Sequence, residues 1–393
     1  MQLRPALRVL LAVVGAASMG WPLYHATMPL DLRVYLAGGD ALLHGHDIYG
    51  SAVQVQGYGF TYPPFAALPM ALLAALPGWL AETVIALAFF AALLTVVQVC
   101  APGLIHRIAD SWGAVLFLAA ILAGQPAWAT LHDGQINMVL AALVLYDLRP
   151  RTQRAPWRGA LVGVAAGLKL TPAIFVLYLL AQRRFRDAGN AAAAFAGTVA
   201  LAALVTPRDS RDFWTHHLYE TSRVGDADRI SNQSLRGLLL RATTSDQLAR
   251  MVWVPLALLT VIIAMWLARR LSAAGAEILA LGVVGIGGCL VSPVSWTHHW
   301  VWFIPVLCGL LASPYRGRRW GAALTAIVAG VFVLGVNKPP MRATYHSALG
   351  RTVFGNLFVL TGLAVIIALA VAVRRPAPEQ AAEIAGPVGA RGR

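Results

Sequence analysis

Long apolar stretches follow one another along most of the chain, with short polar segments between them. A helix that crosses the hydrocarbon core of a bilayer needs about 20 mostly apolar residues. Windows of that size predict helices over residues 7–24, 62–77, 79–100, 112–131, 135–148, 158–182, 190–206, 251–268, 276–291, 300–313, 319–336 and 353–373. Some of these segments are shorter than the hydrocarbon thickness, so we expect one or two to be broken or re-entrant. The pattern predicts an all-α polytopic membrane protein with about 12 transmembrane helices (11–13).

The composition favours the same class. Apolar residues make up 58% of the 393 positions and charged residues only 12%. So few charges do not cover the surface of a soluble protein of this length, so we expect membrane lipids to surround much of the chain. The three cysteines, Cys100, Cys289 and Cys308, lie in apolar stretches. They are expected to be small core residues without a disulfide framework.

The basic residues indicate the orientation of the chain. Its net charge is +14, and the arginines cluster in short loops between apolar segments. The clusters are Arg4 and Arg8; Arg149, Arg151, Arg154 and Arg158; Arg183, Arg184 and Arg186; Arg269 and Arg270; Arg316, Arg318 and Arg319; and Arg374 and Arg375. This spacing is typical of cytoplasmic loops under the positive-inside rule. It does not suggest a nucleic-acid partner.

The charge rule leaves one ambiguity in the first half of the chain. If every predicted segment crosses once, the arginine-rich stretch 149–158 falls outside, against the rule. A break of segment 158–182 near Lys169 keeps these arginines inside, but another early segment must then fail to cross. We favour the break, because Pro172 disrupts helical hydrogen bonds and a buried lysine needs a polar pocket.

Two predicted outer loops, residues 25–61 and 207–250, are too long to be simple connections. Within the first, residues 32–43 have the spacing of a short helix at the membrane surface. Shorter outer loops are expected over 292–299 and 337–352. Residues 1–375 are predicted to form a single transmembrane domain. The Pro-, Ala- and Gly-rich residues 376–393 are predicted to be a disordered cytoplasmic tail.

Polar side chains at membrane depth are costly, so each is a functional candidate. Asp31, close to Tyr35, follows the first predicted helix, where a carboxylate can take a proton from a sugar hydroxyl. A helix cap or a solvated loop charge is the structural alternative. Tyr62 is a candidate to line a sugar site, although Pro63 and Pro64 beside it also explain an extended entry into the next helix.

Two further clusters interrupt the apolar pattern. Asp133, Gln135 and Asn137 suit hydrogen bonds to hydroxyl groups, unless they only form a polar turn between helices. Lys169 is a lone ammonium in an apolar run and needs an anion, for which a lipid phosphate is a suitable partner. The alternative is that its side chain extends to an interface.

The remaining candidates lie in the second half of the chain. They are Asn232, Gln233 and Arg236 in the second long loop, and His298 and His299 between tryptophans. The histidines suit phosphate or sugar binding, or belong to an aromatic belt. Adjacent helical histidines point about 100° apart, which argues against a two-histidine metal site. Asp226-Ala227-Asp228 resembles a divalent-ion motif, but Arg223 and Arg229 flank it, so we expect no metal cofactor.

Six stretches occur in order along most of the chain: Asp31–Tyr35, Phe60–Phe65, Gly134–Asn137, Gly167–Pro172, Asn232–Gly237 and Ser292–Trp302. Together they resemble the polyprenyl-phosphate-mannose-dependent α-1,2-mannosyltransferases of actinobacterial envelopes, glycosyltransferase family 87, which have the GT-C architecture. The similarity is strongest to the branch that acts on phosphatidylinositol mannosides.

The resemblance implies transfer of mannose from polyprenyl-phosphate-mannose to a mannosylated lipid acceptor, with inversion to an α-1,2 linkage, on the outer face of the plasma membrane. It implies that Asp31 is the base. The residues expected to bind the donor phosphate are Lys169, Arg236, His298 and His299. Those expected to contact sugar or acceptor are Tyr35, Tyr62, Asp133, Gln135, Asn137, Asn232 and Gln233.

Other functions remain open at this stage. An arabinosyltransferase or a lipomannan-branching transferase of the same family would share these motifs. A secondary transporter also has about 12 helices and buried charge. However, no repeat relates the two halves, and the polar residues crowd the outer boundary. A non-catalytic carrier of lipid-linked sugar would share the lipid-binding features but would not need Asp31 as a base.

Overall fold

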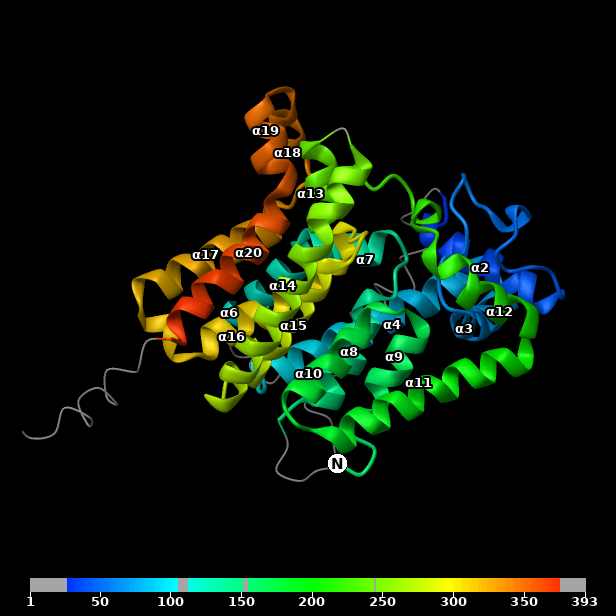
Figure 1. Ribbon diagram of the computed structural model, residues 1–393, viewed down its shortest axis with the longest axis horizontal. Coiled ribbons are helices and arrows are strands. Elements are labelled where there is room, and N and C mark those ends of the chain that lie inside the picture. Colours follow the sequence, from blue (N-terminus) through cyan, green and yellow to red (C-terminus); the bar gives the residue numbers. More distant parts are fainter. Residues whose placement is uncertain (1–26, 105–111, 151–154, 244, 375–393) are drawn as a thin grey trace, which may run out of the picture.

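The computed structural model describes residues 27–104, 112–150, 155–243 and 245–374. Across these ranges the chain is built of α-helices and short 3-10 turns, with two isolated β-bridges. The first predicted helix, 7–24, and the predicted tail, 376–393, lie outside the described residues. The longest helices are α4 (Gly78–Cys100), α11 (Phe185–Val205) and α14 (Asp246–Ala273), shown in Figure 1. Helix α20 (Leu357–Ala372) lies near the end of the described residues.

The other predicted segments also form helices. They are α3 (Pro64–Ala74), α6 (Trp112–Ala123), α7 (Gln125–His132), α8 (Asn137–Leu148), α9 (Ala160–Leu168), α10 (Ile174–Ala181), α15 (Glu277–Val291), α16 (Phe303–Ala312) and α17 (Arg319–Leu334). Within the described ranges, four helices are long and apolar enough to cross a membrane alone: α4, α11, α14 and the run Leu349–Ala372. These features are those of a membrane protein, while the number of crossings remains a prediction.

The break predicted near Lys169 is confirmed. Helix α9 ends at Leu168, Lys169 is extended (φ −156°, ψ 130°), and a 3-10 turn over Thr171–Ala173 leads into α10. A second break, which the sequence pattern did not predict, separates α6 from α7 at Gly124. A Cβ on Gly124 would lie 1.9 Å from the Phe332 ring, so the close approach of α17 requires glycine here.

The arginine-rich turns meet at one end of the helices. The Asn190 side chain near the start of α11 donates to the carbonyl of Pro156, 2.8 Å away, before α9. Arg269 near the end of α14 donates to the carbonyl of Ala181 at the end of α10, 3.1 Å away. The stretch before α9 therefore lies beside the turns that the charge rule places inside, as expected if α9 and α10 are half-helices.

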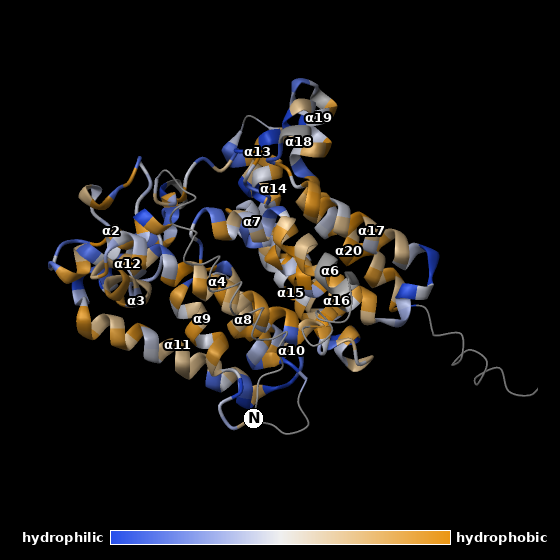
Figure 2. Cartoon of the chain, turned by 180° about the vertical axis from the view of Figure 1, so that it is seen from behind, coloured by the Kyte–Doolittle hydropathy of each residue, from blue (hydrophilic) through white to orange (hydrophobic). Residues whose placement is uncertain are grey.

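The predicted outer loops contain short helices of their own: α2 (Leu30–Leu43), α12 (Pro207–Thr215), α13 (Leu235–Ala242), α18 (Pro339–Arg342) and α19 (Ala348–Val353). Helices α13, α18 and α19 stand at the top of Figure 1, and α2 and α12 lie at its right. Figure 2 shows mostly hydrophobic long helices and more hydrophilic segments around α12 and α13. The predicted short helix over 32–43 is confirmed as α2, while its position at the membrane surface stays a prediction.

Helix α2 packs closely on α3, and this contact positions the start of α2. Leu32 and Tyr35 are buried. A Cβ on Gly39 would lie 2.4 Å from backbone atoms of Met70 in α3, so only glycine allows this approach.

We expect Gly39→Ala to lower the free energy of unfolding by about 1–3 kcal/mol, because backbone rather than a flexible side chain must move. Thermal unfolding of the purified protein, followed by tryptophan fluorescence, measures the effect. Gly197→Ala on α11 is the matched control, since a Cβ there meets nothing within 4 Å. Equal melting temperatures of Gly39→Ala and wild type would contradict this packing.

Candidate active site

A central cavity of about 390 Å³ lies where the predicted outer loops meet. Its lining includes Asp31 from the first long loop, Arg223 from the second, His298 from the loop after α15, and Asn337 from the loop after α17. Lys169 reaches it from the break between α9 and α10. Segments that the charge pattern places on one side of the membrane therefore build one site.

The Gln135 side chain connects residues near the first long loop to the start of α8 through hydrogen bonds. Its Oε1 accepts hydrogen bonds from the hydroxyls of Tyr35 (2.8 Å) and Tyr62 (3.2 Å) and from Asn137 Nδ2 (3.3 Å). Its side chain also hydrogen-bonds to Asp31. Four polar residues chosen from the sequence are thus joined to Asp31 in one network, which fixes the orientation of its carboxylate.

Gly134 allows the polar run to approach α2. Its φ is +71°, in the left-handed region that favours glycine. A Cβ at this position would lie 2.8 Å from Cβ of Leu32. The turn therefore packs directly against the helix that carries Asp31.

Two carboxylates and a histidine converge at the cavity. Ligand atoms of Asp31, Asp133 and His298 all lie within 4.8 Å of one another. Asp133 is 2.9 Å from His132 Nδ1 and 3.4 Å from His298 Nδ1. His298 Nε2 is buried and has no hydrogen-bond partner among the described residues.

The surroundings of Asp31 and Asp133 shift the pKa values of the two carboxyl groups in opposite directions. Burial raises the pKa of Asp31 above its ordinary value, and the nearby His298 and the hydrogen bond from Gln135 oppose that rise. Burial would raise the pKa of Asp133 too, but hydrogen bonds from His132 and His298 outweigh it and lower the pKa to about 2. Asp133 therefore stays ionised and holds His298, while Asp31 is the stronger base of the pair.

Lys169 and His299 form a cationic pair opposite this acid. Lys169 Nζ donates to Asn137 Oδ1 (3.0 Å) and to His299 Nε2 (3.0 Å). Because His299 Nε2 accepts, its Nδ1 carries the ring proton. That Nδ1 is buried and has no hydrogen-bond partner within the described ranges. An ammonium and an unpaired N–H group suit an anionic oxygen such as a phosphate oxygen.

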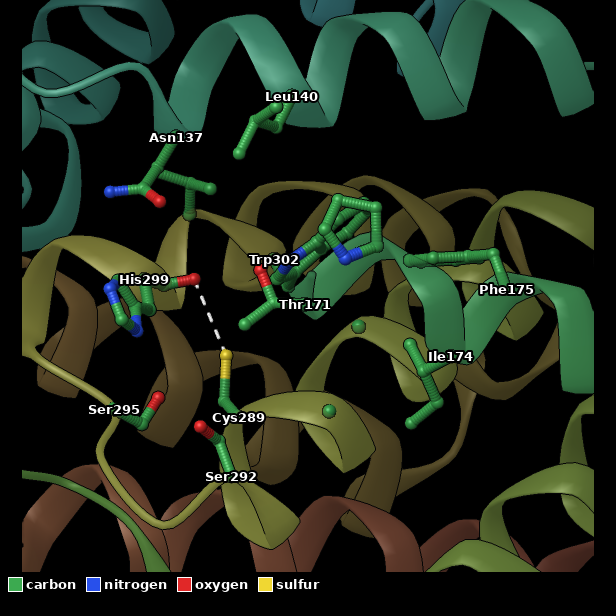
Figure 3. Close-up of a pocket in the computed structure, with 14 residues that line it drawn as sticks. Asn137, Leu140, Thr171, Ile174, Phe175, Cys289, Ser292, Ser295, His299 and Trp302 are labelled. Carbon is green, nitrogen blue, oxygen red and sulfur yellow. Dashed lines mark hydrogen bonds between the residues drawn. The ribbon is translucent and has the colours of Figure 1, made fainter. Parts of the chain in front are cut away.

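A narrow pocket of about 30 Å³ continues from the central cavity beside this pair (Figure 3). The two share Thr171, Ser292 and His299. Cys289 donates from Sγ to the His299 carbonyl at 3.3 Å, the dashed line in Figure 3. The pocket's other walls include the apolar side chains Ile174, Phe175 and Trp302. Its polar end therefore adjoins the cationic pair, and apolar walls follow.

Five predicted binding residues are not among those that line the cavity: Tyr35, Asn137, Asn232, Gln233 and Arg236. Tyr35 and Asn137 belong to the Gln135 network. Asn232 Oδ1 accepts from the backbone N–H of Ser295 (2.8 Å), and Gln233 Oε1 accepts from that of Phe358 (3.1 Å). Arg236 pairs with Asp246 at 3.2 Å. These side chains hold the second long loop on the helices below it. Their contacts in the described residues are with the protein itself, and a direct contact with substrate stays a prediction.

Several cavity residues were not chosen from the sequence: Tyr58, Arg223, Arg229, Trp296 and Asn337. Arg229 pairs with Asp226 of the Asp226-Ala227-Asp228 pattern at 2.8 Å. The three cysteines are buried as expected, and Cys289 also lines the narrow pocket.

One cavity thus brings the Asp31 carboxylate together with the Lys169–His299 pair. The model of glycosyltransferase family 87 matches residues 60–293. This match covers more than half of the chain, so the chain belongs to glycosyltransferase family 87 and is a glycosyltransferase.

Relatives of known name agree with this assignment. The chain is 35% identical over 383 residues, 91% of its length and 88% of the relative's, to the polyprenol-phosphate-mannose-dependent alpha-(1-2)-phosphatidylinositol mannoside mannosyltransferase of Mycobacterium tuberculosis. It is 34% identical over 322 residues, 79% of its length and 77% of the relative's, to the corresponding phosphatidylinositol pentamannoside mannosyltransferase of Mycolicibacterium smegmatis.

Among solved structures, ArnT from Cupriavidus metallidurans bound to undecaprenyl phosphate is similar over 94% of this chain and 76% of that one. The sequence identity is 17% and the TM-score 0.42.

Proposed function

We propose that this protein transfers mannose from polyprenyl-phosphate-mannose to a phosphatidylinositol mannoside, forming an α-1,2 linkage. The names of its relatives support both substrates. The observation that carries the proposal is the position of Asp31 across one cavity from the Lys169–His299 pair. We further propose a GT-C architecture with about 12 crossings, and a cavity that faces outward from the plasma membrane, in keeping with the arginine-rich turns at the opposite end.

The chemistry is a single displacement with inversion. The 2-hydroxyl of the acceptor attacks the anomeric carbon of the β-linked donor, and Asp31 takes the hydroxyl proton as the new C–O bond forms. The bond between the anomeric carbon and the phosphate oxygen breaks, and polyprenyl phosphate leaves as an anion. Lys169 and the His299 Nδ1–H group stabilise the negative charge that develops on that oxygen.

The narrow pocket suits the first atoms of the donor's lipid chain. It opens from the central cavity at His299, beside the proposed phosphate position, and continues between apolar side chains of α10 and η5 (Thr297–Trp302). With the donor phosphate at Lys169, the isoprenoid chain would enter this pocket and point away from Asp31. The sugar, on the other side of the phosphate, would then place its anomeric carbon toward Asp31.

We also propose that transfer needs no metal ion. The Asp31, Asp133 and His298 cluster is close enough to hold one, but Asp133 is already engaged by two histidines, and Lys169 supplies positive charge for the leaving phosphate. Treatment with EDTA is therefore expected to leave the initial rate unchanged. Loss of activity that Mg²⁺ or Mn²⁺ restores would instead assign a metal site to this cluster.

The donor and acceptor are tested together with purified protein in lipid vesicles. Polyprenyl-phosphate mannose and polyprenyl-phosphate arabinose are each supplied with phosphatidylinositol mannosides or with lipomannan. We expect transfer from the mannose donor to phosphatidylinositol mannosides, with an α-1,2 linkage identified by NMR of the product. Transfer from the arabinose donor alone, or to lipomannan alone, would contradict the proposed substrates.

A further inference from the structure

A second polar pocket, of about 370 Å³, adjoins the central cavity on the outer loops. Its lining includes Gln54, Gln56, Tyr58, Arg223, Asp226 and Arg229. It shares Tyr58, Gly59, Arg223 and Arg229 with the central cavity, so the two lie side by side. The pocket is formed by residues of both long outer loops, which are 171 positions apart between Tyr58 and Arg229. The reaction described above gives this pocket no role.

One wall is a tight turn of the first long loop. An isolated antiparallel bridge joins Val55 to Tyr58. Between them Gln56 has φ +52° and Gly57 has φ +83°. A non-glycine residue with positive φ is uncommon, and such residues often occur at ligand sites. The turn places the exposed Gln56 side chain at the rim of the pocket.

The opposite wall comes from the second long loop and is joined to the first. Arg229 Nη1 donates to the Tyr58 hydroxyl at 2.8 Å. Gly225 has φ +103°, and a Cβ there would lie 3.3 Å from Trp296 and 3.4 Å from Tyr58. The close approach of these aromatic rings therefore fixes the boundary between the pocket and the central cavity.

The pocket lining carries two arginines and one carboxylate, and each arginine has a carboxylate neighbour. Arg229 pairs with Asp226 at 2.8 Å. Arg223 lies 3.9 Å from Glu220 and also donates to the backbone carbonyl of Tyr49. Two paired arginines, exposed amide side chains and a tyrosine ring offer donors, acceptors and an aromatic face. This combination suits a neutral polyhydroxyl group better than a free anion.

We propose that this pocket binds a mannosyl residue of the acceptor glycan that does not react, next to the residue whose 2-hydroxyl faces Asp31. The proposal rests on the proposed function and extends it to acceptor selection. The pocket is polar and adjoins the reaction cavity, so an acceptor with a longer glycan fills both, whereas a monomannosylated acceptor fills only the central cavity. The enzyme therefore favours the longer acceptor.

The test uses the double variant Gln54→Ala/Gln56→Gly in the full-length protein. Glycine accepts the positive φ of position 56, so the turn is kept while both amides are removed. We expect the KM for a multiply mannosylated acceptor to rise about tenfold, as for the loss of a few hydrogen bonds. We expect the KM for the mannose donor, kcat, and the KM for a monomannosylated acceptor to stay unchanged. Gln247→Ala, an exposed glutamine on α14, is the matched control.

Binding measured without turnover separates this proposal from the proposed function. Titration with an α-linked mannobiose, followed by tryptophan fluorescence, should show binding to wild type that the double variant loses. If wild type transfers mannose but the double variant keeps both the acceptor KM and mannobiose binding, the pocket is not a glycan site. If wild type binds mannobiose at this pocket but transfers no mannose, the pocket assignment stands and the proposed function fails.

Discussion

Asp31→Asn is expected to lower the turnover number at least ~10²-fold, the typical contribution of a positioned general base. Asparagine keeps the shape of the side chain and a partner for Gln135, but it cannot take the proton of the attacking hydroxyl. The KM for the donor should change little, because Lys169 and His299 remain in place. Initial rates at saturating donor and acceptor measure the effect.

Asp40→Asn is the matched control for this variant. Asp40 lies on the same helix, is exposed, and is 3.3 Å from His44 at the surface. It should retain normal turnover. Near-normal turnover of folded Asp31→Asn would instead show that another group takes the proton.

The pH dependence of the wild-type transfer rate is a second test of the role of Asp31. Only ionised Asp31 accepts a proton, and burial raises its pKa. The rate should therefore fall as the pH decreases through a value above the ordinary range for aspartate. Asp133, with its pKa lowered to about 2, stays ionised throughout this limb and does not contribute to it.

Lys169→Ala is expected to lower kcat/KM for the lipid-phosphate donor by about 10–100-fold, the range for losing a charge-assisted hydrogen bond. The lost ammonium would no longer neutralise the leaving phosphate, and His299 would lose its donor at Nε2. The KM for the acceptor should stay close to that of wild type. Donor titrations at fixed acceptor separate the two effects.

Lys169→Arg should recover part of the loss, because it restores the positive charge with a different geometry. Lys338→Ala is the matched control, since Lys338 lies in a predicted outer loop and, within the described ranges, its Nζ donates to the backbone carbonyls of Ala123 and Val333. An unchanged donor dependence in Lys169→Ala would remove Lys169 from the phosphate site.

Local signals in the sequence were enough to predict the helices and the break at Lys169. Pro172 and an ammonium in an apolar run both oppose an unbroken helix, and the arginine clusters indicate which turns lie together. The break at Gly124 has a local signal too, because Pro126 stands at the start of α7. The close approach of the Phe332 ring to Gly124 is not visible in the local sequence, since it comes from a helix far along the chain.

The candidate site was predictable only in part, for a similar reason. Asp31, Gln135 and Lys169 were predicted as site residues because polar groups are costly in apolar surroundings. Gln233 was predicted as a site residue on the same ground, yet its amide donates to the carbonyl of Gly355, 122 residues away. A sequence pattern cannot distinguish an amide that binds a substrate from one that pairs with distant backbone, since both satisfy a buried polar group.

Transfer of labelled mannose from polyprenyl-phosphate-mannose to a phosphatidylinositol mannoside, by purified wild-type protein in vesicles, tests the central claim most directly. The label should appear in the acceptor lipid, covalently bound through an α-1,2 linkage, together with an equal amount of released polyprenyl phosphate. Intact labelled donor that crosses the bilayer without any label in the acceptor would contradict the claim, because it would show a carrier of lipid-linked sugar and not a transferase.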